Sequence, residues 1–149
     1  MSDERRSEQP EHTDRERESR AGRNRPTILV VDDDEAVRHL LREALHFHGY
    51  RVMDAAVVEE AEESLQRVDA GTIGLVITDI HLTSDPRGQE GYDLYQRWVA
   101  TRPTLHFLLI SGDPDSHALP AVRSGAVRFL LKPFTIDELL AVVRSLVGA

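Results

Sequence analysis

The 149-residue sequence contains no cysteine, and this absence excludes disulfide bonds, thiolate metal sites and a cysteine nucleophile. No apolar run approaches the ~20 residues that a membrane-spanning helix needs. The N-terminal segment also lacks the apolar stretch of a secretory signal. We therefore expect a cytoplasmic protein that makes no contact with membranes.

Basic residues are scarce, with 18 Lys and Arg against 26 Asp and Glu and a formal net charge of −8. Because binding to a nucleic-acid backbone depends on a basic surface, we expect no nucleic-acid partner. Lysine is the scarcest of these residues, since 17 of the 18 are Arg and only Lys132 is Lys. A compact ammonium fits a narrow site that a planar guanidinium does not, so Lys132 is a candidate functional residue.

Residues 1–26 contain no Leu, Ile, Val or aromatic side chain, and their seven Arg balance seven Asp or Glu. Such a segment cannot contribute to a core, so we predict a disordered tail of mixed charge. It is either a solvated spacer or a docking arm. Residues 27–149 carry the whole charge of −8 and have the length of one domain.

From residue 27 onward, segments typical of strands alternate with segments typical of helices. Apolar runs predict five strands, at residues 27–31, 50–55, 75–79, 105–110 and 127–131. Apolar side chains at three- and four-residue spacing predict five helices, at residues 37–45, 58–68, 92–100, 119–124 and 136–147. This strict alternation predicts an α/β fold, a doubly wound five-stranded parallel sheet with five helices.

Polar side chains stand where these strands end. They are Asp32 and Asp33 after the first strand, Asp79 at the end of the third, Ser111 after the fourth and Lys132 after the fifth. Ligands bind beyond the carboxyl ends of the strands in such sheets, so the fold brings these groups to one edge.

Three carboxylates at one edge repel each other, by about 1 kcal/mol for a pair at 4 Å in water and ~4 kcal/mol at an effective dielectric of 20. The cluster therefore needs a cation. Oxygen ligands without Cys or suitably spaced His select Mg²⁺ or a similar ion. With the Lys132 ammonium and the Ser111 hydroxyl, this site suits the placement of a phosphoryl group on a carboxylate.

Four segments, ILVVDDDEAVRHLL, LVITDIHL, LLISGD and FLLKPF, resemble a response-regulator receiver domain of two-component signalling. The resemblance covers residues 27–147 and implies the flavodoxin-like receiver fold. It implies that Asp79 is the phospho-acceptor and one of the Mg²⁺ ligands. Asp33 would bind Mg²⁺ directly, Asp32 would bind it through water, and the backbone carbonyl of His81 would complete the protein ligands.

The resemblance also implies a switch hydroxyl at Ser111, a switch aromatic at Phe129 and a phosphate partner at Lys132, with a cis peptide bond to Pro133. The phosphoryl donor would be a sensor histidine kinase or a histidine phosphotransfer protein. The output would pass to an unknown downstream protein. His81 and Asp113 stand where side chains in this family tune the lifetime of the phosphoryl bond.

The sequence departs from the family pattern after the acceptor. Receiver domains usually have Pro four residues after it and Gly eight residues after it, but here these positions are Thr83 and Arg87. The matching glycine is then Gly91, which implies four extra residues in the segment TSDPRGQEG beside the metal site.

Other readings of these residues are possible. Asp34 is expected only to cap the first helix. For Asp32 and Asp33, helix capping without a functional role is the alternative interpretation. The alternatives to a stand-alone phospho-acceptor are a magnesium-dependent phosphohydrolase with an aspartyl nucleophile and a receiver-like module that is never phosphorylated. A hydrolase of this kind usually needs a second acid two residues after the nucleophile, but position 81 is His. The three intact carboxylates and the lysine argue against a module that is never phosphorylated. We therefore expect a regulatory domain without an attached output domain, and not an enzyme.

Overall fold

The computed structural model describes residues 25–67, 72–82 and 88–148. Five strands form one sheet: β1 (Thr27–Val31), β2 (Arg51–Ala55), β3 (Ile73–Asp79), β4 (His106–Ser111) and β5 (Arg128–Leu131). All neighbouring pairs are parallel, and the order across the sheet is β2-β1-β3-β4-β5. The predicted doubly wound sheet is confirmed.

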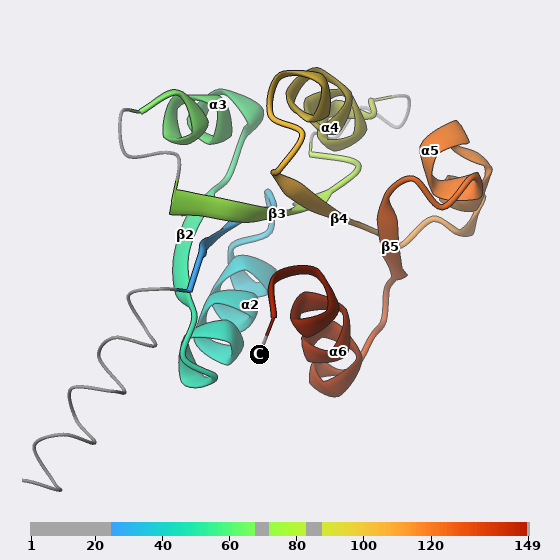
Figure 1. Ribbon diagram of the computed structural model, residues 1–149. Helices are drawn as coiled ribbons and strands as arrows, with labels where there is room; N and C mark the ends of the chain where they lie inside the picture. Colours follow the sequence, from blue (N-terminus) through green and yellow to red (C-terminus); the bar gives the residue numbers. More distant parts are fainter. Residues whose placement is uncertain (1–24, 68–71, 83–87, 149) are drawn as a thin grey trace, which may run out of the picture.

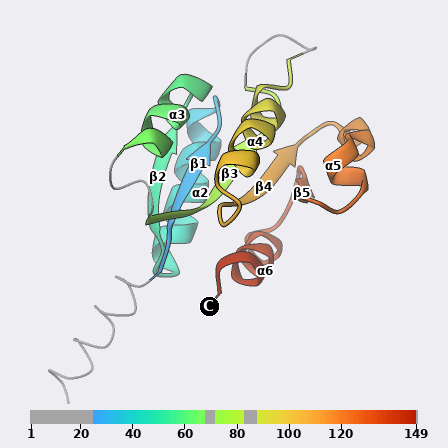
Figure 2. The same cartoon turned by 45° about the horizontal axis from the view of Figure 1, so that its top comes forward.

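The described residues form five α-helices, of which the first four connect the strands and the last follows β5: α2 (Glu35–Phe47), α3 (Val58–Gln66), α4 (Glu90–Thr101), α5 (Pro120–Arg123) and α6 (Ile136–Val147). Helices α2 and α6 lie on one face of the sheet, and α3 and α4 lie on the other (Figure 1). The short α5 lies beside β5 at the outer edge, as the turned view of Figure 2 also shows. None of the helices in the described ranges is long and apolar enough to cross a membrane.

Strand β1 shows why its run is apolar at every position. Ile28 and Val30 belong to the core cluster that α2 and α6 cover, whereas Leu29 and Val31 belong to the cluster beneath α3 and α4. All four side chains are buried. Because successive side chains of a strand point to opposite faces, a strand with helices on both faces must be apolar throughout.

The helix ends follow the signals in the sequence. The Asp34 carboxylate accepts hydrogen bonds from the backbone N–H groups of Ala36 and Val37, so its predicted capping role is confirmed. Gly49, predicted to end the first helix, has φ of 89°, a conformation that favours glycine at this position. Pro120 occupies the first turn of α5, where its missing N–H costs nothing.

Several predicted boundaries need correction. Ser111 is the last residue of β4 and does not follow it. The helix predicted at 119–124 is shorter, and a 3₁₀-helix that the sequence did not predict, η2 (Pro114–Ala118), precedes it. Its polar residues have no apolar periodicity, so no pattern marked it. The end of the helix predicted at 58–68 and the core of the extra segment, residues 83–87, lie outside the described residues.

The predicted tail also lies outside the described residues, except for Arg25 and Pro26. The Arg25 guanidinium donates to the backbone oxygen of His48 at 2.7 Å and lies 5.0 Å from the centre of the Tyr50 ring. Arg25, two residues before the predicted start of the domain, thus already contacts the folded part.

Gly91, at the start of α4, packs directly against the end of β3. Its N–H donates to the backbone oxygen of Ile80 at 3.0 Å. A β-carbon at this position would lie 1.9 Å from the backbone oxygen of Asp79 and 2.9 Å from the Thr78 hydroxyl. Only glycine lets α4 approach Asp79 this closely, which gives a physical reason for the glycine expected here.

We predict that Gly91→Ala destabilises the fold by about 2 kcal/mol or more, because the added methyl group collides with a backbone atom that cannot rotate away. Gly112→Ala is the matched control, since a β-carbon there meets no atom within 4 Å. Chemical denaturation of both variants measures the difference. Equal stability of the two would contradict the close packing of α4 on β3.

Candidate functional site

Three predicted carboxylates converge at the carboxyl edge of the sheet. Asp32 follows β1, Asp79 ends β3, and these strands are neighbours with Val31 opposite Thr78. One carboxylate oxygen from each of Asp32, Asp33 and Asp79 lies within 4.8 Å of the others. Asp32 is 2% exposed and Asp79 is 9% exposed, whereas Asp33 is open to solvent. The cluster is therefore buried on one side and accessible on the other.

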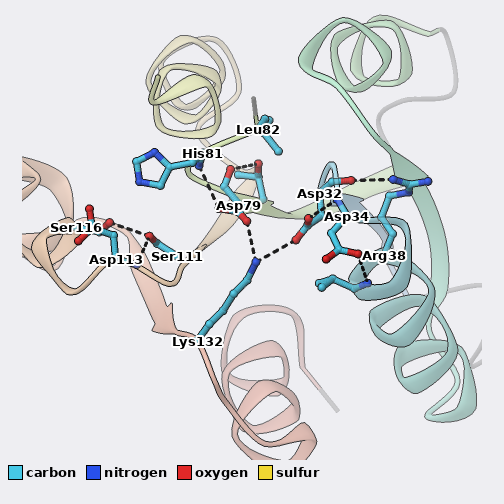
Figure 3. A network of polar contacts seen from close by, with 12 residues as sticks. Asp32, Asp34, Arg38, Asp79, His81, Leu82, Ser111, Asp113, Ser116 and Lys132 are labelled. Carbon is cyan, nitrogen blue, oxygen red and sulfur yellow. Dashed lines mark hydrogen bonds and ion pairs between the residues drawn. The ribbon is translucent and has the colours of Figure 1, made fainter. Parts of the chain in front are cut away.

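Lys132 reaches this cluster from the end of β5. Its Nζ donates to Asp79 Oδ2 at 2.8 Å and to Asp32 Oδ2 at 3.4 Å (Figure 3). Its backbone N–H donates to the backbone oxygen of Ser111 at 2.8 Å, which fixes the start of the side chain beside β4. The peptide bond between Lys132 and Pro133 is cis, as expected. The single lysine of the chain thus joins two of the three carboxylates.

The electrostatics of the site are set by burial and by these ion pairs. Burial alone would lower the pKa of Lys132, but the hydrogen bond to Asp79 and the charges of Asp79 and Asp32 outweigh it and raise this pKa. Burial raises the pKa of Asp32 and exceeds the opposing effects of the Asp34 N–H and of Lys132. One ammonium therefore does not fully compensate the buried carboxylate, and a second cation would stabilise its charged form.

The backbone of Asp32 is held from both sides. Its N–H donates to the backbone oxygen of Ala55 at 3.1 Å, and its backbone oxygen accepts from Arg38 Nη1 at 2.9 Å. Arg38 Nε also donates to Asp54 Oδ2 at 3.1 Å. Arg38 was not predicted as a site residue, although its place one helical turn after Asp34 puts it on the face of α2 near the strand ends.

Asp79 and its neighbours are fixed in a similar way. The His81 N–H donates to Asp79 Oδ1 at 3.1 Å, so each oxygen of the Asp79 carboxylate has one donor. His81 Nδ1 lies 2.6 Å from the Gly88 oxygen, and because a carbonyl only accepts, this nitrogen carries the proton. The predicted role of the His81 carbonyl as a metal ligand stays a prediction.

The two predicted switch residues lie beside the cluster. Ser111 is fully buried, and its hydroxyl accepts hydrogen bonds from the Asp113 N–H at 2.9 Å and from the Ser116 hydroxyl at 3.0 Å. The half-buried Phe129 ring packs against the exposed His117 ring, with 4.7 Å between the ring centres. Among the described residues, no hydrogen bond joins Ser111 to Asp79.

This arrangement has a defined chemical capacity. Its three carboxylates offer only oxygen ligands, which suit a hard divalent cation such as Mg²⁺ better than a metal that prefers nitrogen or sulfur. An ammonium stands beside the innermost carboxylate oxygens, where it could neutralise an added anionic group. The site can therefore hold a cation and an oxyanion side by side.

Comparison with known proteins agrees with this geometry. The family described as the response regulator receiver domain matches residues 28–144. The C4-dicarboxylate transport transcriptional regulatory protein DctD of Rhizobium meliloti is 32% identical over 120 residues, which cover 80% of this chain and 25% of DctD. The chain spans 25–49% of the length of the first curated relatives that it matches.

Solved structures of receiver domains superpose on most of the chain. The non-phosphorylated HemR receiver domain from Leptospira biflexa is 34% identical with a TM-score of 0.68, covering 83% of this chain and 95% of that one. The response regulator protein TrrA from Thermotoga maritima, in complex with Mg²⁺ and BeF, is 28% identical with a TM-score of 0.66, covering 82% of this chain and 99% of that one. The match over residues 28–144, on a sheet whose carboxyl edge carries the acidic cluster and its lysine, shows that this chain belongs to the response regulator receiver domain family.

Proposed function

We propose that this receiver accepts a phosphoryl group on Asp79 from a sensor histidine kinase or a histidine phosphotransfer protein. The observation that carries the proposal is the position of the Asp79 carboxylate, which lies within the acidic cluster and 2.8 Å from the only lysine. Receiver domains are phosphorylated by histidine kinases and are regulatory domains rather than enzymes. Family membership therefore confirms that the chain is not a phosphohydrolase.

Asp32, Asp33 and Asp79 would hold the Mg²⁺ ion. Their oxygen donors fit this cation, and TrrA, a relative with the same fold, was solved with Mg²⁺ and BeF. When bound, the ion supplies positive charge to the phosphoryl oxygens. Asp33 is exposed and Asp32 is buried, so these two carboxylates would hold the ion at the boundary between solvent and the interior.

Phosphoryl transfer then forms a bond between an Asp79 oxygen and phosphorus. The P–N bond of the donor phosphohistidine breaks, and the histidine nitrogen keeps the electron pair. The protein contributes position and charge, since the His81 N–H holds Asp79 Oδ1 while the Lys132 ammonium, already beside Oδ2, contacts a phosphoryl oxygen. The Ser111 hydroxyl donates to a second phosphoryl oxygen, and Phe129 repacks as Ser111 moves.

We further propose that residues 27–149 are the receiver, with residues 1–26 as a tail. The output is a change in the surface that a downstream protein binds. A receiver-like module that is never phosphorylated would not need the partly buried Lys132–Asp79 pair, which costs desolvation energy.

We expect acetyl phosphate with Mg²⁺ to phosphorylate the protein and Asp79→Asn to lose this labelling almost completely, because the amide is not a nucleophile. Asp93→Asn, which removes an exposed carboxylate from the first turn of α4, is the matched control and should label normally. Intact mass and peptide mapping measure the product. Normal labelling of Asp79→Asn would show that the acceptor is another residue.

Magnesium should stabilise the fold through the acidic cluster. A ligand at about ten times its dissociation constant adds about 1.4 kcal/mol to the free energy of unfolding. Asp33→Asn should remove most of this gain, because one of the three ligands loses its charge. Asp34→Asn removes a neighbouring charge but keeps the capping oxygen, so it should respond to Mg²⁺ like the parent. Thermal unfolding in MgCl₂ and in KCl of equal ionic strength separates them, and equal loss in both variants would argue against a specific site.

The reactivity of Lys132 reports its surroundings. Only a neutral amine is acylated, and because the pKa of Lys132 is raised, the group stays protonated to higher pH than an ordinary lysine. Its labelling at pH 9 should therefore be slower than that of an ordinary lysine, and its rate should reach a plateau only at a higher pH. The α-amino group, the only other amine in this chain, is the internal reference.

Adding beryllium fluoride to the Mg²⁺-loaded protein should slow the acylation of Lys132 further, since the phosphoryl mimic binds the ammonium directly. The measured quantity is the rate at Lys132 divided by the rate at the α-amino group. If beryllium fluoride leaves this ratio unchanged, Lys132 does not contact the phosphoryl group.

A further inference from the structure

One short segment contacts both proposed switch residues. The 3₁₀-helix η2 places Ser116 against Ser111 and the next residue, His117, against Phe129. The Ser116 hydroxyl is 3.0 Å from the Ser111 hydroxyl, and the two ring centres of His117 and Phe129 are 4.7 Å apart. Only two residues separate η2 from β4, so a movement of Ser111 at the end of that strand would change both contacts.

The Ser111 hydroxyl is directed toward Ser116 and the Asp113 N–H, on the side away from Asp79 (Figure 3). Asp113 also caps η2 by accepting from the Asp115 N–H at 2.9 Å, so the turn that presents Ser116 is itself fixed. Ser116 is 5% exposed, and its N–H donates to the backbone oxygen of Asp113 at 3.1 Å. The hydroxyl of Ser116 therefore has little access to water as a replacement partner.

These contacts set up a competition for one hydroxyl. In the resting site the Ser111 oxygen accepts from Ser116 and from the Asp113 N–H, whereas a phosphoryl group on Asp79 offers charged oxygens to which the Ser111 O–H can donate. For Ser111 to donate to them, its hydroxyl must leave Ser116, and the buried Ser116 hydroxyl then loses its partner. A buried polar group without a partner is costly, so this contact opposes the movement of Ser111.

We propose that Ser116 is a positioning residue that holds the Ser111 hydroxyl away from Asp79 and so sets the threshold for activation. This inference rests on the proposed function, in which Ser111 donates to the phosphoryl group. When the Ser111 side chain turns toward the phosphoryl group, Ser116 loses its hydrogen bond and η2 becomes more mobile. His117 then no longer holds the Phe129 ring in place. The segment thereby links the two switch residues.

Beryllium fluoride in the presence of Mg²⁺ is the probe, and its binding to the full chain is measured by titration calorimetry or by amide chemical shifts. Ser116→Ala should bind it about fivefold more tightly, because the competing hydrogen bond is gone. Ser116→Thr keeps a hydroxyl and should return the affinity toward that of the parent. Ser145→Ala, on the surface of α6, is the matched control and should leave the affinity unchanged.

A double-mutant cycle separates positioning from a general effect on the fold. In a Ser111→Ala background the hydroxyl for which Ser116 competes is absent, so Ser116→Ala should no longer change the affinity. His117→Ala should tighten binding in the parent and should free the Phe129 ring, seen as narrower aromatic resonances, since it removes the second contact of η2.

The outcomes are distinguishable. If the parent binds beryllium fluoride and Asp79→Asn does not, but Ser116→Ala binds with parental affinity, the inference is wrong and the proposed function stands. An equal effect of Ser116→Ala with and without the Ser111 hydroxyl also overturns the inference. If the parent and Asp79→Asn bind alike, the proposed function fails, and the inference fails with it.

Discussion

Repulsion among Asp32, Asp33 and Asp79 dominates the carboxyl edge of this sheet. Their oxygens lie within 4.8 Å of one another, and burial keeps solvent from screening Asp32. The Lys132 ammonium offsets part of this repulsion by bonding two of the three groups. The site therefore favours the binding of a further cation. An anion that binds there needs such a cation beside it, because the carboxylates repel it. Such a balance makes the edge responsive to small changes in charge.

That balance requires a backbone that does not yield to the repulsion. Strands β1 and β3 are buried on both faces, and the Asp32 backbone is bonded on one side to Ala55 and on the other to Arg38. On the β3 side, Gly91 brings α4 against the Asp79 oxygen. Apolar packing and backbone hydrogen bonds thus hold the carboxylates together at a distance that their charges alone would not allow.

The sequence was sufficient for the parts of the site that topology determines. Once the strands were recognised, a parallel sheet had to bring Asp32, Asp79 and Lys132 to one edge, whatever the loops did. The contacts of Ser116, His117 and Arg38 could not be found in this way. They depend on how a polar turn folds back over β4 and on the rotamer of a long side chain, and neither leaves a periodic pattern. The direction of the Ser111 hydroxyl is likewise set by its neighbours and not by its own identity.

At the edge of the sheet opposite the acidic cluster, Tyr50 contacts both ends of the described chain. Its face receives the Arg25 guanidinium, and its hydroxyl donates to the Gly148 oxygen at 3.0 Å, so one side chain contacts both the first residue of the described chain and its Gly148 end. A short linker between these two positions would respect the fold, and the chain could be reopened at the exposed turn around Gly125, giving a circular permutant. In that permutant, β5 and α6 would be synthesised before β1, although β1 lies near the centre of the sheet. The acidic edge would keep the same four side chains, now drawn from a different order along the chain.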